Sequence, residues 1–251
     1  MKDKVSIITP LFNAERFICE TIDSVLAQTY ENWELIIVDD LSTDGGYQIV
    51  KSYTEKDDRI KLLQNEINSG AAITRNNAIK YATGKYIAFL DSDDLWLPNK
   101  LEIQISFMKE KDIAFSFASY YKIDENGEIK GKHLVKKNVG YRDILKTCSI
   151  GCLTAVYDAE KLGKVYMYNI RKRQDFALWL QILKTVDQAY AIPHILAKYR
   201  LRDSSISSSK KSVLKYQWSV YREVEKLSII KSSYYFAYYA VNGIINKYLK
   251  H

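Results

Sequence analysis

The stretch YIAFLDSDD, residues 86–94, places three carboxylates directly after a continuous apolar run. A short apolar run bounded by polar residues is typical of a strand buried in a parallel sheet. Residues 33–40, WELIIVDD, repeat the arrangement, with Asp39 and Asp40 closing the run. The two stretches therefore predict two buried strands that end in acidic side chains.

Helix and strand patterns alternate around these stretches. Such alternation is typical of βαβ units, which build a mostly parallel sheet. The further elements expected in this half are strands over residues 5–9 (ended by Pro10) and 60–63, and helices over 15–28, 45–56 and 71–82.

Beyond residue 100 the alternation is looser and indicates an antiparallel extension of the sheet. A polar, Ser-rich loop is expected over residues 203–212, and a helical, tyrosine-rich tail over 213–250. The other expected elements are a helix over 98–110, a strand over 113–121 with a turn at 124–127 and a return strand, strands near 153–157 and 188–199, and a helix near 175–185.

Composition limits the kind of protein. With 251 residues, 47% of them hydrophobic, the chain can bury a core in one large or two small domains. Three cysteines (Cys19, Cys148 and Cys152) and three histidines provide neither a disulfide framework nor a zinc site, so the cysteines are expected to be buried. The sequence has no recognisable signal peptide or membrane span, and the chain is expected in the cytosol.

The net charge of +7 is unevenly spread, because residues 1–100 carry −5 and the remainder +12. A basic protein suggests an anionic partner such as a nucleic acid, a phospholipid or a phosphorylated substrate. The acidic first hundred residues argue against nucleic-acid binding. They suggest a specific role for the carboxylates there.

Carboxylates at strand ends would share one crevice, because ligands of open parallel sheets lie outside the carboxyl ends of the strands. Asp39, Asp40, the acids within residues 91–94 and Asp175, at the start of a later helix, all fall at such places. They would repel one another unless a cation neutralised them, and oxygen ligands without His or Cys suit Mg²⁺ or Mn²⁺ bound together with phosphates. The alternative is that the acids cap helices, above all Asp40 and Asp44.

Several sequence blocks follow one another in a fixed order. They are ITPLFNAE (8–15), VDDLSTDG (38–45), GAAITR (70–75), GKYIAFLDSDD (84–94) followed by Trp96 and Pro98, and QDFALWL (174–180). In this order and spacing the blocks resemble family 2 glycosyltransferases. The resemblance covers roughly residues 4–205 and is far more specific than a lone Asp-x-Asp would be.

The resemblance implies a GT-A fold, that is, a Rossmann-like α/β fold with a mostly parallel sheet and helices on both faces, plus a C-terminal helical extension. Residues 1–205 would form the catalytic domain, with a nucleotide-sugar-binding half (1–100) and an acceptor-binding half (101–205). Residues 206–251 would form a lid loop and a basic, tyrosine-rich helical tail. The implied reaction uses a nucleotide-diphospho-sugar and a divalent metal, and inverts the anomeric carbon.

The resemblance also implies roles for the donor site. Asp39 matches the position that accepts the uracil imide N–H, which favours a UDP-sugar. Arg75 matches a position that reaches the nucleotide or its phosphates, and its alternative is a surface arginine. Arg202, together with Arg200, matches the lid segment that closes over the diphosphate, and the alternative there is a plain surface loop. The remaining donor-binding candidates are Thr9, Pro10, Phe12, Glu15 and Ser92, of which Phe12 could equally be core.

Metal, base and acceptor roles follow in the same way. Asp93 matches the metal ligand of the Asp-x-Asp motif, with Asp91 beside it, and the ion, Mn²⁺ or Mg²⁺, would assist the departure of UDP. Asp175 would be the general base that takes the proton of the acceptor hydroxyl. Trp96 and Trp179 are candidate platforms for acceptor sugars and equally candidate core residues.

Three positions depart from the family pattern. Leu41 stands where the family usually has Gly, Gln174 where it usually has Glu, and Arg202 where many relatives have His. Because the Glu of the family normally supports the site next to the base, Gln174 leaves a non-catalytic nucleotide-sugar-binding module as an alternative function. A sugar-phosphate nucleotidyltransferase would need a Gly-rich basic loop where this chain has residues 9–13, TPLFN.

The tail combines lysines and arginines with tyrosines, which is typical of segments that lie in an anionic membrane interface. A helix packed on the catalytic body, or a homodimer contact, explains the same pattern. With membrane contact through residues 213–251, the protein would be peripheral at the inner face of the plasma membrane. The acceptor would then be a glycan or a lipid-linked sugar.

Overall fold

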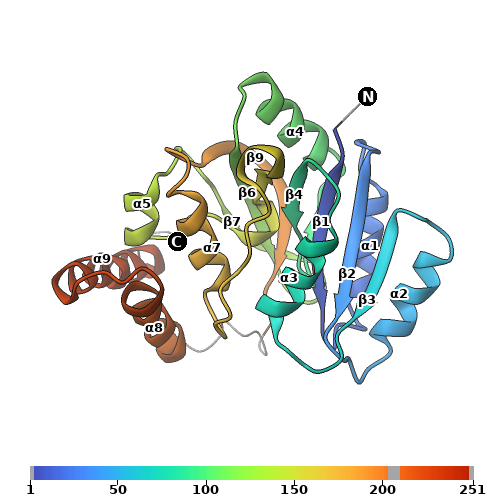
Figure 1. The fold of residues 1–251 in the computed structure, drawn as a ribbon, viewed down its shortest axis with the longest axis horizontal. Coiled ribbons are helices and arrows are strands. Elements are labelled where there is room, and N and C mark those ends of the chain that lie inside the picture. The colour runs from blue at the N-terminus through green and yellow to red at the C-terminus, as the bar shows by residue number, and fades with distance from the viewer. Residues whose placement is uncertain (1–2, 203–209, 249–251) are drawn as a thin grey trace.

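The computed structural model describes residues 3–202 and 210–248 (Figure 1). Over these residues the strands are β1 (Val5–Leu11), β2 (Trp33–Asp39), β3 (Ile60–Gln64), β4 (Tyr86–Phe89), β5 (Leu95–Trp96), β6 (Phe115–Ile123), β7 (Ile129–His133), β8 (Val156–Asp158) and β9 (Tyr190–Arg200). They form one sheet in the order β3-β2-β1-β4-β8-β6-β9-β5, and β7 pairs with β6.

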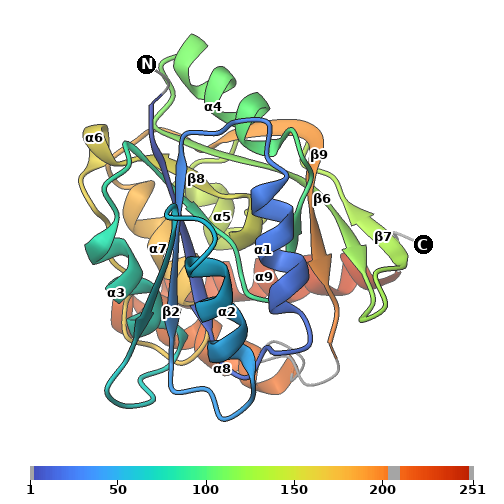
Figure 2. The same ribbon diagram turned by 90° about the vertical axis from the view of Figure 1, so that its right-hand side faces the viewer.

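The helices of the described residues cover both faces of this sheet. They are α1 (Ile18–Leu26), α2 (Gly46–Thr54), α3 (Ala71–Tyr81), α4 (Lys100–Glu110), α5 (Tyr141–Lys146), α6 (Ala159–Leu162), α7 (Gln174–Ile182), α8 (Lys210–Ser219) and α9 (Ile229–Tyr248), with a 3₁₀ turn at Cys152–Thr154 and a π-helical turn at Val220–Val224. Figure 2 shows α3 and α7 on one side of the sheet and α1 on the other.

Strands β3, β2, β1 and β4 are mutually parallel, whereas β8 is antiparallel to both β4 and β6. From β1 the chain adds β2 and β3 on one side, then returns to place β4 on the other side. The strand order therefore reverses between β1 and β4. In such sheets the ligand crevice lies at this reversal, outside the carboxyl ends of the strands.

Alternate residues of β2 face opposite halves of the core. Ile36 and Val38 join a buried cluster that includes residues of α3 and α7. Leu35 and Ile37 join a second cluster that includes residues of α1 and α4. This two-sided burial explains why the strand is apolar throughout.

The α/β prediction is confirmed, and in the first hundred residues every expected strand and helix is present with ends shifted by at most three residues. One boundary was wrong, because β1 continues through Pro10 to Leu11. The β1–β4 ladder ends at Ile8, so beyond it β1 is paired with β2 alone. A residue without an N–H is tolerated where a strand is free on one side.

The second half differs more from expectation. The short elements β5, α5 and α6 were not expected, because so few residues carry no periodic signal. Of the expected loop 203–212, residues 203–209 lie outside the described residues, and α8 already begins at Lys210. The tail is helical as expected over its described residues, and it divides at a break between Val224 and Ile229.

The tail packs on the body. Val220 and Tyr221 are fully buried in the larger core cluster, and the Tyr221 hydroxyl donates to the carbonyl of Leu145 in α5. Over residues 3–202 and 210–248, no helix has the length and apolar character needed to cross a membrane.

Candidate active site

Two loops at the carboxyl edge are joined by reciprocal hydrogen bonds. The backbone N–H of Glu15 donates to Asp44 Oδ2 at 2.8 Å, and the N–H of Gly45 donates to Glu15 Oε2 at 2.9 Å. Leu41, in the loop after β2, has a φ of 59°. This left-handed conformation costs a side-chain-bearing residue about 1–2 kcal/mol, which explains why glycine suits the position.

Asp39 closes β2 and is fully buried. Its carboxylate accepts hydrogen bonds from the N–H and hydroxyl of Ser42 and from Gln64 Nε2, the last at 2.9 Å. An ionised carboxylate has about four acceptor positions, so these bonds leave capacity for one further donor.

Asp40 holds the entry to α3. Its two oxygens accept from the backbone N–H groups of Ser69 and Gly70, at 2.7 and 2.8 Å, and Asn65 Nδ2 donates to it as well. Asp40 thus anchors the loop that leads into α3, but it does not cap the helix, because both backbone donors precede its first residue, Ala71. By fixing the start of α3, Asp40 also fixes the position of Arg75 in its second turn.

Arg75 points at the acidic loop after β4. Its Nη2 donates to Asp91 Oδ1, and its side chain is only 8% exposed. Burial acts to lower the pKa of this guanidinium, but the charges of Asp91 and Asp175 help to raise the pKa above its usual value. The alternative of a surface arginine is therefore wrong. Its buried Nε has no hydrogen-bond partner among the described residues.

Asp93 forms an ion pair with Arg202, with 3.0 Å between Oδ2 and Nη1. Burial raises the pKa of Asp93, the charge of Asp91 raises it further, and Arg202 opposes both effects. The two carboxylates are therefore close enough to repel each other, and each already faces an arginine.

Arg200 does not belong to a lid. It is the last residue of β9 and is buried, with Nε donating to the carbonyl of Asp93 and Nη2 to Glu20 Oε2, both at 2.8 Å. Its backbone N–H donates to Asp94, also at 2.8 Å. Arg200 thus braces the loop that carries Asp91 and Asp93. This corrects its assignment to a flexible segment.

Asp175 lies in the first turn of α7 and is partly buried. Its charge acts on Arg75 and on the thiol of Cys152, a partly buried residue. The pKa of Cys152 is raised by burial first and then by Asp91, with Asp175 adding to the effect. Asp175 is therefore near enough to act electrostatically on Arg75, the partner of Asp91, although it comes from a later part of the chain.

The two tryptophans are core residues. Trp179 is fully buried against Phe89 and Phe115, at centroid distances of 5.4 and 5.3 Å. Trp96 is buried too, and its Nε1 donates to the carbonyl of Leu153 at 2.7 Å. Neither ring offers an open face to a sugar, which corrects the platform prediction in favour of its alternative.

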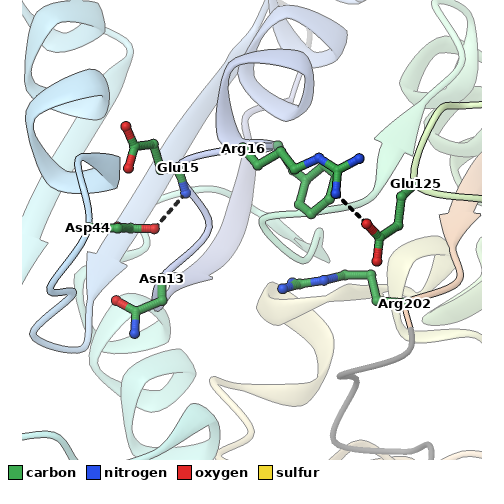
Figure 3. A pocket seen from close by; sticks show the side chains of 7 residues that line it. Asn13, Glu15, Arg16, Asp44, Glu125 and Arg202 are labelled. Atoms are coloured by element: carbon green, nitrogen blue, oxygen red, sulfur yellow. Dashed lines mark hydrogen bonds and ion pairs between the residues drawn. The ribbon is translucent and has the colours of Figure 1, made fainter.

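A cleft of about 540 Å³ lies at this edge, and Figure 3 shows the side chains that line it. The guanidinium carbons of Arg16 and Arg202 lie 5.0 and 5.1 Å from the centroid of the Phe17 ring, and Arg16 also pairs with Glu125. The cleft is lined by Asn13, Glu15, Arg16, Phe17, Asp44, Glu125 and Arg202.

Of the predicted donor-binding residues, Glu15 and Arg202 line this cleft and the others do not. Thr9 is buried, and its hydroxyl has no partner among the described residues; Pro10 is partly buried and Ser92 is buried. Phe12 is half exposed, so the alternative that it belongs to the core is wrong.

Asn13, Arg16 and Glu125 line the cleft without having been singled out from the sequence. A turn at 124–127 was expected, but its contact with Arg16 spans more than a hundred residues and has no local signal. The positive φ of Asn13, 48°, was indicated only by its residue type, since asparagine tolerates this conformation.

The residues present could hold a divalent metal. Over residues 3–202 and 210–248, no three His, Cys, Asp or Glu side chains converge as a metal site. Asp91 and Asp93 supply hard oxygen ligands from two residues. Mg²⁺ in phosphate-binding sites commonly takes one or two carboxylates and completes its shell with phosphate and water, so the donor set fits.

A sheet with a strand-order reversal, and with carboxylates and arginines at the carboxyl ends of its strands, defines a nucleotide-binding type of α/β protein. The sequence model described as "Glycosyl transferase family 2" matches residues 6–159. The chain therefore belongs to glycosyltransferase family 2, and it is a glycosyltransferase.

Two curated relatives match nearly the whole chain. One, the putative teichuronic acid biosynthesis glycosyltransferase TuaG of Bacillus subtilis, is 46% identical over 97% of this chain and 97% of its own length. The other is the UDP-Glc:alpha-D-GlcNAc-diphosphoundecaprenol beta-1,3-glucosyltransferase WfgD of Escherichia coli. It is 46% identical over 96% of this chain and 93% of its own length.

Solved structures share the fold. TarS of S. aureus, residues 1–349 with UDP-GlcNAc, superposes with a TM-score of 0.73 at 23% identity, covering 94% of this chain and 71% of that one. The mannosyltransferase PcManGT of Pyrobaculum calidifontis, in complex with GDP-Man and Mn2+, superposes with a TM-score of 0.70 at 17% sequence identity. The match covers 94% of this chain and 70% of that one. These neighbours are GT-A glycosyltransferases, so the GT-A prediction is confirmed.

Proposed function

We propose that the protein transfers a sugar from a UDP-sugar, with UDP-glucose as the first candidate, to a hydroxyl of a lipid-linked or glycan acceptor, inverting the anomeric carbon. The relative WfgD carries a name that states a UDP-Glc donor, a diphosphoundecaprenol-linked acceptor and a beta product. TarS has been solved with UDP and with UDP-GlcNAc.

The donor would lie along the carboxyl edge, with its uracil at Asp39. The one acceptor position left free on that carboxylate suits the imide N–H, and Gln64 would have to shift because Asp39 is fully buried. The diphosphate would then lie toward Arg202, whose fork of donors suits phosphate oxygens.

Asp91 and Asp93 would hold the divalent metal, Mn²⁺ or Mg²⁺, which when bound supplies positive charge for the departing diphosphate. Arg202 now pairs with Asp93 and would turn from the carboxylate to the phosphates as the donor enters. Arg75 would stay on Asp91 and orient it.

Asp175 would accept the proton of the attacking hydroxyl on the face of the sugar opposite UDP. The observation that carries this role is its position in the first turn of α7, from which its charge acts on Arg75, the partner of Asp91. One displacement of this kind inverts the centre and needs no covalent nucleophile.

The test uses Asp175→Asn, with turnover followed as UDP release from UDP-glucose in the presence of Mn²⁺ and a GlcNAc-diphospho-lipid. General-base catalysis is commonly a factor of about 10²–10⁴, so kcat should fall by that much while the Kd for UDP stays unchanged.

The matched control is Asp187→Asn, an exposed acid after the same helix, which should keep full turnover. Full activity in Asp175→Asn would remove the residue from the mechanism. UDP binding without any turnover in the wild-type protein, over a range of UDP-sugars and acceptors, would favour the non-catalytic binding module.

A further inference from the structure

Helix α9 has two apolar faces, and only one of them packs on the protein. On the inner face, the Phe236 ring meets Trp218 edge-on at 5.5 Å, and Tyr235 packs against Tyr221 at 6.4 Å. From the same face, Tyr239 meets Arg173 at the start of α7. These contacts fix the helix and its rotation.

The outer face is an exposed apolar stripe, formed by Ile230, Tyr234, Ala237, Tyr238 and Val241. Ile230 is 79% exposed, Tyr234 50% and Val241 52%. The spacing of four, three and one residues puts all five side chains on one side of the helix. Apolar side chains gathered in this way on a surface mark an interaction site.

The charges around the stripe are positive. The sequence of α9 contains no Asp or Glu, and exposed Lys226 and Lys231 lie at its start. Lys146 of α5 lies 5.2 Å from the centroid of the Tyr238 ring. Two copies meeting through this stripe would bring like charges together, whereas an anionic surface would complement them.

We propose that this apolar stripe lies in the interface of an anionic lipid membrane, with Ile230 and Val241 in the acyl boundary and the tyrosines at the headgroups. Apolar and aromatic side chains flanked by lysines bind such interfaces by combining buried area with attraction to anionic lipid. The inference deepens the proposed function and rests on it for the nature of the acceptor. A membrane-bound acceptor would meet the protein on the side of α7, where α8 and α9 lie (Figure 1).

The experiment is co-sedimentation of the full chain with phosphatidylcholine vesicles, with and without phosphatidylglycerol. The test variant is Ile230→Glu/Tyr234→Glu/Val241→Glu. Three carboxylates placed at an anionic surface should lower the partition coefficient by about a hundredfold. The wild-type protein should bind only the vesicles that contain phosphatidylglycerol.

A matched control adds the same charge elsewhere, as Tyr81→Glu/Ile129→Glu/Tyr166→Glu, at exposed apolar residues far from α9 in sequence. It should keep most of the binding. A milder Ile230→Asn/Tyr234→Asn/Val241→Asn set, checked by circular dichroism, guards against misfolding. Equal binding by test and control variants, or no binding by the wild type, would overturn the proposal.

Light scattering on the same samples separates lipid from protein contact. A wild-type dimer that the test variant converts to a monomer, without change in vesicle binding, would assign the stripe to a second copy and overturn the proposal. UDP binding is measured in parallel. Vesicle binding that depends on the stripe in a protein unable to bind UDP would refute the donor assignment and leave the membrane surface standing.

Discussion

Lys100, at the start of α4, is a fully buried lysine. Its ammonium donates to Gln104 Oε1 at 3.0 Å and lies 3.9 Å from the centroid of the Trp96 ring. Burial lowers its pKa to about 7. Trp96 therefore supports a buried lysine with its π face, a role that no local sequence pattern indicated.

This pKa makes stability depend on pH. In the unfolded chain the lysine titrates near 10.4, so between about pH 7 and 10 the unfolded state binds more protons than the folded state. The free energy of unfolding should therefore rise with pH across this window, by at most about 1.4 kcal/mol per pH unit. The contribution of Lys100 to stability is lowest below pH 7.

Lys100→Met removes this dependence. Urea unfolding should show the variant more stable than the wild type near pH 7, with the advantage shrinking toward pH 10. Lys111→Met, an exposed lysine just after the same helix, should shift stability equally at every pH. A pH-independent advantage for Lys100→Met would show that Lys100 is charged throughout.

At the scale of elements, α9 braces the start of α7. Arg173 has a φ of 67° as the residue before α7, and its guanidinium lies 5.0 Å from the centroid of the Tyr239 ring and 5.7 Å from that of Phe176. Its Nη2 donates to the Tyr239 hydroxyl. Asp175 is two residues further on, so the contact holds the turn that carries the proposed base.

Tyr239→Phe keeps the ring and removes the hydroxyl. Because one hydrogen bond from a charged donor is lost, we expect kcat to fall by about threefold to tenfold, with UDP affinity unchanged and stability lower by about 1–2 kcal/mol. The control is Tyr235→Phe, on the same helix face. Equal kcat values for the two variants in single-turnover assays would show that α9 does not position α7.

Periodicity located the elements of the first half because each has a complete apolar pattern of its own. Helices α1, α2 and α3 and strands β1 to β4 were all expected. The short β5 and α5 were not, since β5 exists only by pairing Leu95 and Trp96 with β9, a contact of about a hundred residues' separation. Pairing partners, unlike periodicity, are a property of the fold.

For the whole molecule, residues 1–100 and residues 101–205 share one sheet through the β4–β8 and β5–β9 pairs. Arg202, after β9, pairs with Asp93, after β4, so the two parts of the chain meet at the acidic loop. A ligand that bridges them should therefore stabilise the molecule as one cooperative unit.

We expect one thermal transition. UDP with Mn²⁺, at about 100 times its Kd, should raise the free energy of unfolding by about 2.7 kcal/mol and the Tm by roughly 5–10 °C. In Asp93→Asn the Mn²⁺-dependent part of this shift should disappear. Asp58→Asn, an exposed acid, should retain it. An equal shift with and without Mn²⁺ in the wild type would contradict metal binding with UDP.

By itself the sequence determined the α/β alternation and the acidic ends of β2 and β4, because apolar periodicity and the polar residues that bound each apolar run are local properties. Tertiary structure alone decided that Arg202 faces Asp93, that Arg200 braces the acidic loop, that both tryptophans are core, and that one face of α9 is left uncovered. Each of these depends on which distant segments pack together. The packing of distant segments minimises the free energy of the whole chain, so no single stretch of sequence predicts it.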